Sequence, residues 1–195
     1  MTHAQPGQTI DHYRLVKLLG QGADSEVFLA VDTRNKRQVS LKILMDPEST
    51  NATARFDRAA MLWQRLNHPN IAAVYGYGVM ADGCPYLVLE YIQGYSIEDI
   101  IDHEAPLDLE RAMRLFRQLM LALRVAHRQG VLHRDIKPTN ILVTHTQTRD
   151  PRHAAREQVK LIDFGLARTY ETGDERNISH MTVTMAGHVV GTPRY

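Results

Sequence analysis

The segment 133–140 reads His-Arg-Asp-Ile-Lys-Pro-Thr-Asn, and downstream Asp163 opens an Asp-Phe-Gly sequence. A carboxylate such as Asp135 can accept a proton from a hydroxyl nucleophile, and the ammonium of Lys137 can hold a phosphate as its charge moves. Asn140 and Asp163 offer hard oxygen ligands, which suit Mg²⁺ far better than zinc or copper. An acid, a lysine, an amide and a second acid in this order indicate phosphoryl transfer.

This pair of motifs resembles the catalytic and metal-binding core of the eukaryotic-type protein kinases. The resemblance implies that Asp135 orients and deprotonates the acceptor hydroxyl and that Asn140 and Asp163 hold Mg²⁺. A lysine two residues after Asp135, here Lys137, is typical of serine/threonine kinases. The sequence as a whole is most similar to the bacterial branch of the family. The implied function is transfer of the γ-phosphate of Mg-ATP to serine or threonine hydroxyls of proteins, including the chain itself.

A glycine-rich segment near the N-terminus has the form G-x-G-x-x-S-x-V. Two glycines between apolar runs often mark an ordinary hairpin turn. Its flanks, Tyr13–Leu19 and Glu26–Val31, read as strands, which fits the kinase loop that closes over ATP phosphates rather than the strand–helix dinucleotide fingerprint. The expected ATP contacts in this loop are Leu19, Gly20, Gln21, Gly22, Ala23, Asp24, Ser25, Glu26 and Val27.

Two further strands carry the remaining expected nucleotide contacts. Segment 38–44 alternates apolar and polar residues, which predicts a strand with Lys42 on its polar face; a half-exposed strand with a solvent lysine is the less favoured interpretation. By resemblance Lys42 is the third catalytic residue and the ligand of the α- and β-phosphates. The buried-strand pattern 85–92 leads into a polar break that resembles the kinase hinge. The remaining expected ATP contacts are Leu89 as gatekeeper, the backbone around Glu90 and Ile92, and Leu142.

The sequence departs from the kinase pattern on the helix predicted at 55–66. Kinases place there a glutamate that pairs with the phosphate-binding lysine, but the corresponding position is Ala59. Asp57 lies two residues earlier, about 200° around the helix, and Glu26 is another carboxylate to consider. Losing a charge-assisted hydrogen bond of about 1.5–3 kcal/mol predicts a rate loss of roughly ten- to two-hundred-fold. A nucleotide-binding pseudokinase that acts as a switch or scaffold is therefore the alternative function, and an interaction module with an empty cleft is a third.

The predicted fold is α+β, a two-lobed kinase-like architecture. Residues 1–9 are expected to be disordered, and 10–92 to form an N-terminal lobe of five antiparallel strands and one helix. Residues 93–195 are expected to form the hinge and a partial, mainly helical second lobe, because the family continues beyond Gly-Thr-Pro-x-Tyr into further helices.

Helices are predicted at 96–103 and 108–129. The second has Asp108 as a plausible N-cap, ends at Gly130 and carries an apolar stripe. Without the family's later helices this stripe is expected to be exposed, which predicts self-association or a covering partner. The stripe consists of Leu109, Ala112, Met113, Phe116, Leu119, Met120, Leu123 and Ala126.

The C-terminal part resembles a kinase activation segment, here 168–190, followed by Gly-Thr-Pro-Arg-Tyr. Thr182 and Thr184 are the expected autophosphorylation sites. The Gly-Thr-Pro-Arg-Tyr segment is expected to dock the substrate, with Thr192 contacting the catalytic loop. An insertion at 145–158 separates two strands that would otherwise form a tight hairpin. An exposed elaboration is the favoured interpretation of this insertion, and a docking site is the other.

Composition limits the remaining function classes. The chain has 195 residues, 44% of them apolar, and a net charge of +1, which gives no long-range attraction to nucleic acid. Cys84 is the lone cysteine and the histidines are scattered, so a disulfide framework or a zinc site is disfavoured and a cytoplasmic location fits. His133 is expected to have a structural role rather than to act as a base. No apolar run is long enough to span a membrane. ATP and Mg²⁺ are the expected cofactors and proteins the expected substrates.

Overall fold

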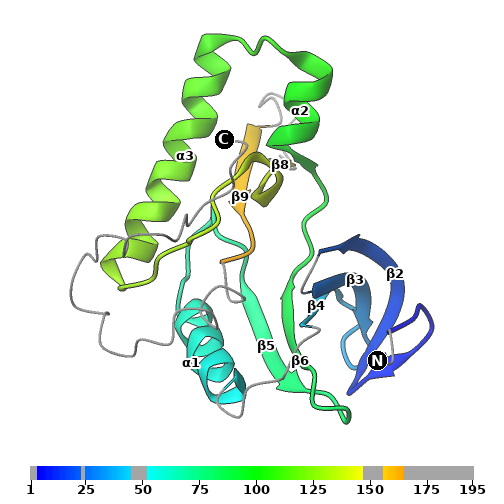
Figure 1. The fold of residues 1–195 in the computed structure, drawn as a ribbon. Coiled ribbons are helices and arrows are strands. Elements are labelled where there is room, and N and C mark those ends of the chain that lie inside the picture. Colours follow the sequence, from blue (N-terminus) through cyan, green and yellow to red (C-terminus); the bar gives the residue numbers. More distant parts are fainter. Residues whose placement is uncertain (1–3, 23–24, 45–51, 147–155, 165–195) are drawn as a thin grey trace, which may run out of the picture. The chain divides into compact units, whose positions relative to one another are not determined.

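The computed structural model describes residues 4–22, 25–44, 52–146 and 156–164, with side chains of the first helix described from Phe56 onward. The chain forms two compact units, coloured by sequence in Figure 1. The first unit contains residues 1–65 and 73–91, and the second contains 66–72 and 92–195. The α+β class predicted from the sequence is confirmed, since strands and helices both contribute to the described part of the chain.

The first unit is built on an antiparallel sheet with strand order β1-β2-β3-β4-β6-β5. One face carries an apolar core that includes Leu15, Phe28, Leu41 and Val88. Successive side chains of a strand point to opposite faces, so the apolar residues at every second position of β3 and β4 lie on this face. The six strands are β1 (Thr9–Ile10), β2 (Tyr13–Gln21), β3 (Ser25–Asp32), β4 (Gln38–Leu44), β5 (Val74–Val79) and β6 (Pro85–Glu90).

The expected disorder of residues 1–9 is wrong for the described part of that segment, residues 4–9. The Gly7 N–H donates to the Leu15 carbonyl at 2.9 Å, and the Leu15 N–H donates to Gln8 at 2.8 Å. Ala4 packs against the apolar core. Backbone pairing along the sheet edge requires no apolar side chains, so the polar composition gave no signal for it. The two-residue strand β1 is therefore a sixth strand beside the five predicted.

Helix α1 (Ala52–Gln64) packs on β5 and β6 within the first unit. Its buried side chains are Phe56, Ala60 and Trp63, which recur at the spacing of one helix face. The ring of Phe56 meets the ring of Tyr77 on β5 edge-on, with centroids 6.2 Å apart. The helix thus covers the face of the sheet to which Tyr77 points.

The described part of the second unit contains two helices and a three-stranded sheet of order β7-β8-β9. Ser96 caps α2 with a reciprocal capping box to Asp99, and Asp108 caps α3 by accepting the Arg111 N–H. Gly130 follows α3 with φ 73°, a conformation that glycine adopts without strain. The elements are α2 (Ile97–Glu104), α3 (Leu109–Arg128), the 3-10 turn η1 (Pro138–Asn140), β7 (Tyr95–Ser96), β8 (Ile141–Thr146) and β9 (Arg156–Leu161).

A close backbone approach fixes the start of this unit. A Cβ on Gly94 would lie 2.3 Å from the Val143 carbonyl oxygen on β8, so only glycine fits there. The Thr144 hydroxyl donates to the Gln93 carbonyl at 2.8 Å. These contacts join the segment after β6 to β8.

The predicted stripe on α3 divides between two environments. Leu119, Leu123 and Ala126 are buried, whereas four members of the stripe are exposed. These four are Leu109, Met113, Phe116 and Met120. Leu115 and Ala122 are buried instead, because α3 packs on β9 through a face rotated away from the centre of the stripe.

Helix α3 lies against β9 (Figure 1), and polar side chains join the two elements. The Arg111 guanidinium binds the Glu157 carboxylate at 2.7–2.8 Å and also Glu104, and the bond to Glu157 is the main cause that raises the Arg111 pKa. The Gln118 amide oxygen accepts from Asn70 at 2.9 Å and from the Val159 N–H at 3.1 Å. These bonds hold β9 in place, and its first residues extend into the insertion predicted at 145–158.

In the described part of the chain, no helix is long and apolar enough to cross a membrane.

Candidate active site

The segment 133–140, which is the predicted catalytic loop, brings Asp135, Lys137 and Asn140 together. The Lys137 ammonium lies 2.9 Å from a carboxylate oxygen of Asp135. The Asn140 side-chain amide donates to the same oxygen at 3.0 Å and to the Asp135 backbone carbonyl at 2.8 Å. The turn η1 after Lys137 makes this possible because it folds Asn140, which is buried, back toward Asp135. A cation and an amide thus hold one carboxylate in a defined position, as a general base requires.

His133 supports this loop from inside the unit, as the sequence predicted for a structural histidine. Its Nε2 lies 2.8 Å from the Ile162 carbonyl, and the Asp135 N–H donates to its Nδ1 at 3.3 Å. The two bonds together require a neutral ring with the proton on Nε2. Burial lowers the pKa of His133, which favours that neutral form. The ring also packs on Phe164, with centroids 4.7 Å apart, so it joins the two motifs.

The residues expected to hold Mg²⁺ fit a hard cation. Because the Asn140 nitrogen faces Asp135, its amide oxygen faces the other way and is available as a ligand. Asp163 follows Ile162, whose N–H donates to the Asn140 carbonyl at 3.0 Å, so the two ligands come from directly bonded segments. Asp163 adopts φ 59°, a left-handed conformation that turns the backbone sharply at this residue. Mg²⁺ is commonly bound by one or two side-chain ligands together with substrate phosphates, which this pair matches.

In the first unit, the glycine-rich segment is a hairpin between β2 and β3, as predicted. The Gly22 N–H donates to the Ser25 carbonyl at 2.8 Å, which closes the turn. Gly20 pairs with Val27 across the hairpin, and Val27 pairs on its other side with Lys42. The loop and the lysine expected to bind phosphates are therefore neighbours in one sheet. Ala23 and Asp24 lie outside the described residues.

Lys42 and helix α1 share one face of this sheet. Tyr77, Leu87, Lys42 and Val27 lie opposite one another on successive strands, so their side chains project to the same side. Since Phe56 of α1 packs on Tyr77, the helix lies on that side too. Lys42 is buried there, with an exposed fraction of 6%.

Glu26 pairs with Ile43 and therefore projects from the opposite face, which carries the apolar core. The strand register does not favour Glu26 as a substitute for the glutamate missing at position 59. Ala59 itself is half-buried, one helical turn after Phe56.

The other expected nucleotide contacts belong to the ends of strands. Leu89 is buried on β6, pairing with Ser40, and Glu90 ends that strand. Ile92 and Leu142 are half-buried in the second unit, where Leu142 pairs with Ser96 and Lys160. The expected phosphorylation sites Thr182 and Thr184 and the docking residue Thr192 lie outside the described residues.

Sequence reasoning missed a set of contacts around Glu90. Its carboxylate accepts the Ala73 N–H at 3.2 Å, and Ala73 precedes β5. Neighbouring Tyr75 packs under Arg37, whose guanidinium carbon lies 4.0 Å from the ring centroid. Backbone partners of this kind leave no side-chain pattern, so nothing in the sequence indicated them.

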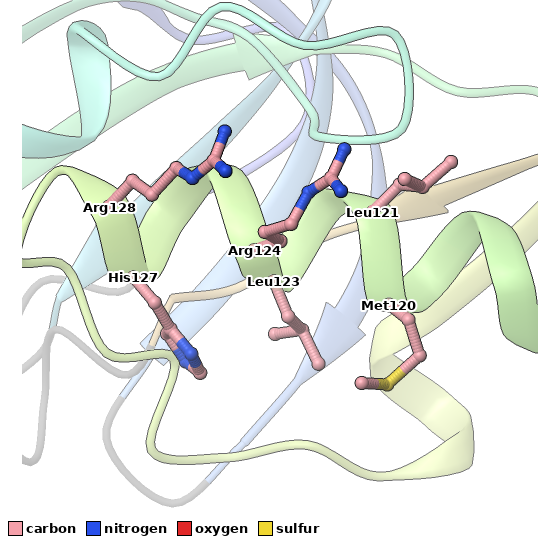
Figure 2. A pocket seen from close by; sticks show the side chains of 6 residues that line it. All are labelled: Met120, Leu121, Leu123, Arg124, His127 and Arg128. Atoms are coloured by element: carbon pink, nitrogen blue, oxygen red, sulfur yellow. The ribbon is translucent and has the colours of Figure 1, made fainter.

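A surface hollow of about 590 Å³ lies along the C-terminal half of α3, shown in Figure 2. Among the described residues, one helix supplies the side chains that line it, as Figure 2 shows; they are Met120, Leu121, Leu123, Arg124, His127 and Arg128. It contains none of the residues of the catalytic loop or the glycine-rich hairpin. The hollow is therefore separate from the chemistry that the motifs predict.

Comparison with known proteins gives a consistent result. Residues 13–195 match the family model described as the protein kinase domain. The serine/threonine-protein kinase pkn3 of Myxococcus xanthus is 37% identical over 192 residues, which is 97% of this chain and 33% of that protein. The serine/threonine-protein kinase PknB of Mycobacterium tuberculosis is 36% identical over 195 residues, 97% of this chain and 29% of that protein. The chain thus spans about a third of the length of these relatives.

Solved structures agree at the level of the fold. The crystal structure of the Mycobacterium tuberculosis PknI kinase domain matches with a TM-score of 0.69 and 28% identity, covering 84% of this chain and 64% of that one. A second crystal structure of the same domain matches with a TM-score of 0.69 and 27% identity, covering 84% of this chain and 62% of that one. The kinase-like fold predicted from the sequence is thereby confirmed.

Proposed function

Since the chain belongs to the protein kinase family, we propose that it transfers the γ-phosphate of Mg-ATP to serine or threonine hydroxyls of proteins. The observation that carries this proposal is the position of the Asp135 carboxylate, held by Lys137 at 2.9 Å and by Asn140 at 3.0 Å. In this role Asp135 accepts the proton of the acceptor hydroxyl, and the oxygen of that hydroxyl attacks the γ-phosphorus. The bond from the γ-phosphorus to the β–γ bridging oxygen breaks, and ADP leaves. Lys137 neutralises charge on the transferred group.

The nucleotide-binding part of the proposal rests on the first unit. The hairpin around Gly20 and Gly22 places backbone N–H groups over the phosphates, and Lys42 binds the α- and β-phosphates. Leu89 and Val27 provide apolar contacts for adenine, and the backbone from Glu90 to Ile92 hydrogen-bonds its edge. Support comes from the register that makes Lys42 a direct neighbour of the hairpin.

Asn140 and Asp163 are the proposed Mg²⁺ ligands. When bound with ATP, Mg²⁺ supplies charge neutralisation at the phosphates. The orientation of the Asn140 amide, with its nitrogen turned to Asp135 and its oxygen turned away, supports this assignment.

A nucleotide-binding pseudokinase is the second candidate, and Ala59 is the observation that favours it. The helix α1 lies on the sheet face of Lys42, but it presents a methyl group where kinases have a carboxylate. Such a protein would bind Mg-ATP and act as a switch or scaffold with little or no turnover.

Protein substrates follow from the proposed activity, and the chain itself is one of them through Thr182 and Thr184. Thr192 is the proposed contact between a docked substrate and the catalytic loop. The exposed residues of the α3 stripe, Met113 and Phe116 among them, support self-association or a covering partner. The lone Cys84 supports a reducing compartment, and we assign the chain to the cytoplasm on that ground.

The proposal is tested by phosphate transfer and nucleotide binding in parallel. The chain and its Asp135→Asn variant are incubated with γ-labelled ATP and a generic protein substrate, with and without Mg²⁺. A serine/threonine kinase gives label on serine or threonine that requires Mg²⁺ and disappears in the variant. A pseudokinase gives no label, although Mg-ATP still raises the melting temperature of both proteins. No label and no shift would contradict both functions.

A further inference from the structure

Glu90, the last residue of β6, is bonded to the start of β5 through its backbone and its side chain. The Glu90 N–H donates to the Ala73 carbonyl at 2.8 Å, and the Ala73 N–H donates to a Glu90 carboxylate oxygen at 3.2 Å. In a regular antiparallel ladder, the second of these bonds runs to a backbone carbonyl. Here a side chain accepts it, so the carboxylate is part of the joint between the two strands.

This joint lies beside a β-bulge. The pairing of β5 with β6 shifts between Val74 and Gly76, which leaves Tyr75 as the additional residue. Bulges redirect side chains and are frequent next to active sites. The Arg37 guanidinium stacks on the Tyr75 ring at 4.0 Å and donates to its hydroxyl.

The charge of Glu90 also acts on Tyr75. Burial is the main cause that raises the Tyr75 pKa, Arg37 opposes the increase, and Glu90 adds to it. Arg37 comes from the turn before β4, Tyr75 from β5 and Glu90 from β6. Polar contacts therefore connect three chain segments at the end of the sheet where β6 stops.

We propose that Glu90 is a positioning residue for the adenine ring: its carboxylate, bonded to the Ala73 N–H, fixes the end of β6 so that the backbone from Glu90 to Ile92 can bind the base. The inference rests on the proposed nucleotide-binding function and adds a role for a side chain to it. Backbone groups bind a planar base well only when they are held in place, and strand ends fray unless they are tied down. The bond from Ala73 provides that restraint at the residue where the strand ends.

A purely structural role is the competing explanation, in which the carboxylate stabilises the sheet and nothing more. The two explanations differ in what they predict for ligands. A positioning role affects ligands that carry adenine and spares ligands that carry phosphates alone. A structural role lowers stability and affects both ligands equally or neither.

The test compares Glu90→Ala, Glu90→Gln and a control, Glu110→Ala, in the complete 195-residue chain. Glu110 is an exposed glutamate on α3 that pairs with Arg114. Calorimetry measures the affinity for ADP and for inorganic tripolyphosphate, both with Mg²⁺, well below the melting temperature of every variant. We expect ADP affinity to fall about tenfold in Glu90→Ala, which corresponds to loss of one hydrogen bond to a charged acceptor.

Glu90→Gln keeps an acceptor oxygen and should stay within about threefold of the wild type, since a neutral acceptor is weaker than a charged one. Tripolyphosphate affinity should not change in any variant. If transfer is measurable, the KM for ATP should rise in Glu90→Ala while kcat is retained. Amide exchange at Ala73, read by NMR, should accelerate in Glu90→Ala and remain slow in Glu90→Gln.

Several results would overturn the inference. Faster exchange at Ala73 with unchanged ADP affinity would show a restraint that does not serve the base. Equal loss of ADP and tripolyphosphate binding would indicate general loosening of the unit. A wild type that binds neither ligand would refute the nucleotide site itself, and this inference with it.

Discussion

Replacing Ala59 by glutamate should raise the affinity of the protein for Mg-ATP. Position 59 lies one turn after Phe56, which packs on Tyr77, and Tyr77 shares its sheet face with Lys42. A glutamate at this half-buried position can therefore extend along the face from which the Lys42 ammonium projects. Kinases use such a pair to keep the lysine directed at the α- and β-phosphates.

The expected gain has an upper limit set by one charge-assisted hydrogen bond. Such a bond contributes about 1.5–3 kcal/mol, and each 1.4 kcal/mol is about a factor of ten. Ala59→Glu should therefore raise Mg-ATP affinity, or kcat/KM where transfer is measurable, by up to roughly ten- to 150-fold. The helix itself tolerates the change, because glutamate is nearly as good a helix former as alanine.

The assay pairs calorimetry of Mg-ATP with initial rates of phosphate transfer. Ala59→Gln is the matched control, since it has the same length without the charge, and it should show little or none of the gain. In a Lys42→Met background, Ala59→Glu should also have no effect, because the charge it is meant to hold is absent. An equal response to glutamate and glutamine, or a gain that survives Lys42→Met, would refute the argument that α1 and Lys42 act on one face.

Three further outcomes are expected. Asn70→Ala should lower the free energy of unfolding, measured by urea titration, by about 1–3 kcal/mol. The reason is that it removes a buried amide that donates to Gln118 and to β9. A change below about 0.5 kcal/mol would contradict this prediction. The free energy of unfolding should fall as pH drops below about 6.5, because the unfolded chain takes up a proton that burial disfavours on His133. The dependence of that free energy on pH should be weaker in His133→Gln, and an identical dependence in both proteins would contradict the prediction. Met113→Ser combined with Phe116→Ser should reduce self-association in light scattering, since both side chains are exposed on α3, whereas unchanged mass would exclude this stripe as the contact.

Local chemistry made several elements predictable from the sequence. The strand 38–44 has the predicted bounds, because apolar and polar residues alternate along it from Gln38 to Ile43. The ends of α3 were also predictable, since Asp108 supplies a capping carboxylate and Gly130 supplies a left-handed turn. The meeting of Asp135 with Asn140 follows from the short turn between them, which the motif itself encodes.

Features that depend on tertiary partners could not be predicted in the same way. The stripe on α3 is wide enough to include two faces, and only the position of β9 decides that Leu115 is buried while Phe116 is exposed. The strand β9 begins at Arg156, within a polar segment that gives no strand signal, because Glu157 is bonded to Arg111 of α3. The role of Glu90 depends on a backbone amide seventeen residues away, and a single sequence carries no trace of such a contact.

The proposed mechanism makes Asp135 the base of a Mg²⁺-dependent phosphoryl transfer. Its most direct test is the single-turnover rate of γ-phosphate transfer from Mg-ATP to a serine- and threonine-containing protein, measured for the wild type and for Asp135→Asn. The structure predicts transfer by the wild type and a loss of about 10²–10⁴-fold in the variant, which retains the shape of the side chain but cannot accept the proton. Equal rates in the two proteins, or no transfer by a wild type that binds Mg-ATP, would contradict it.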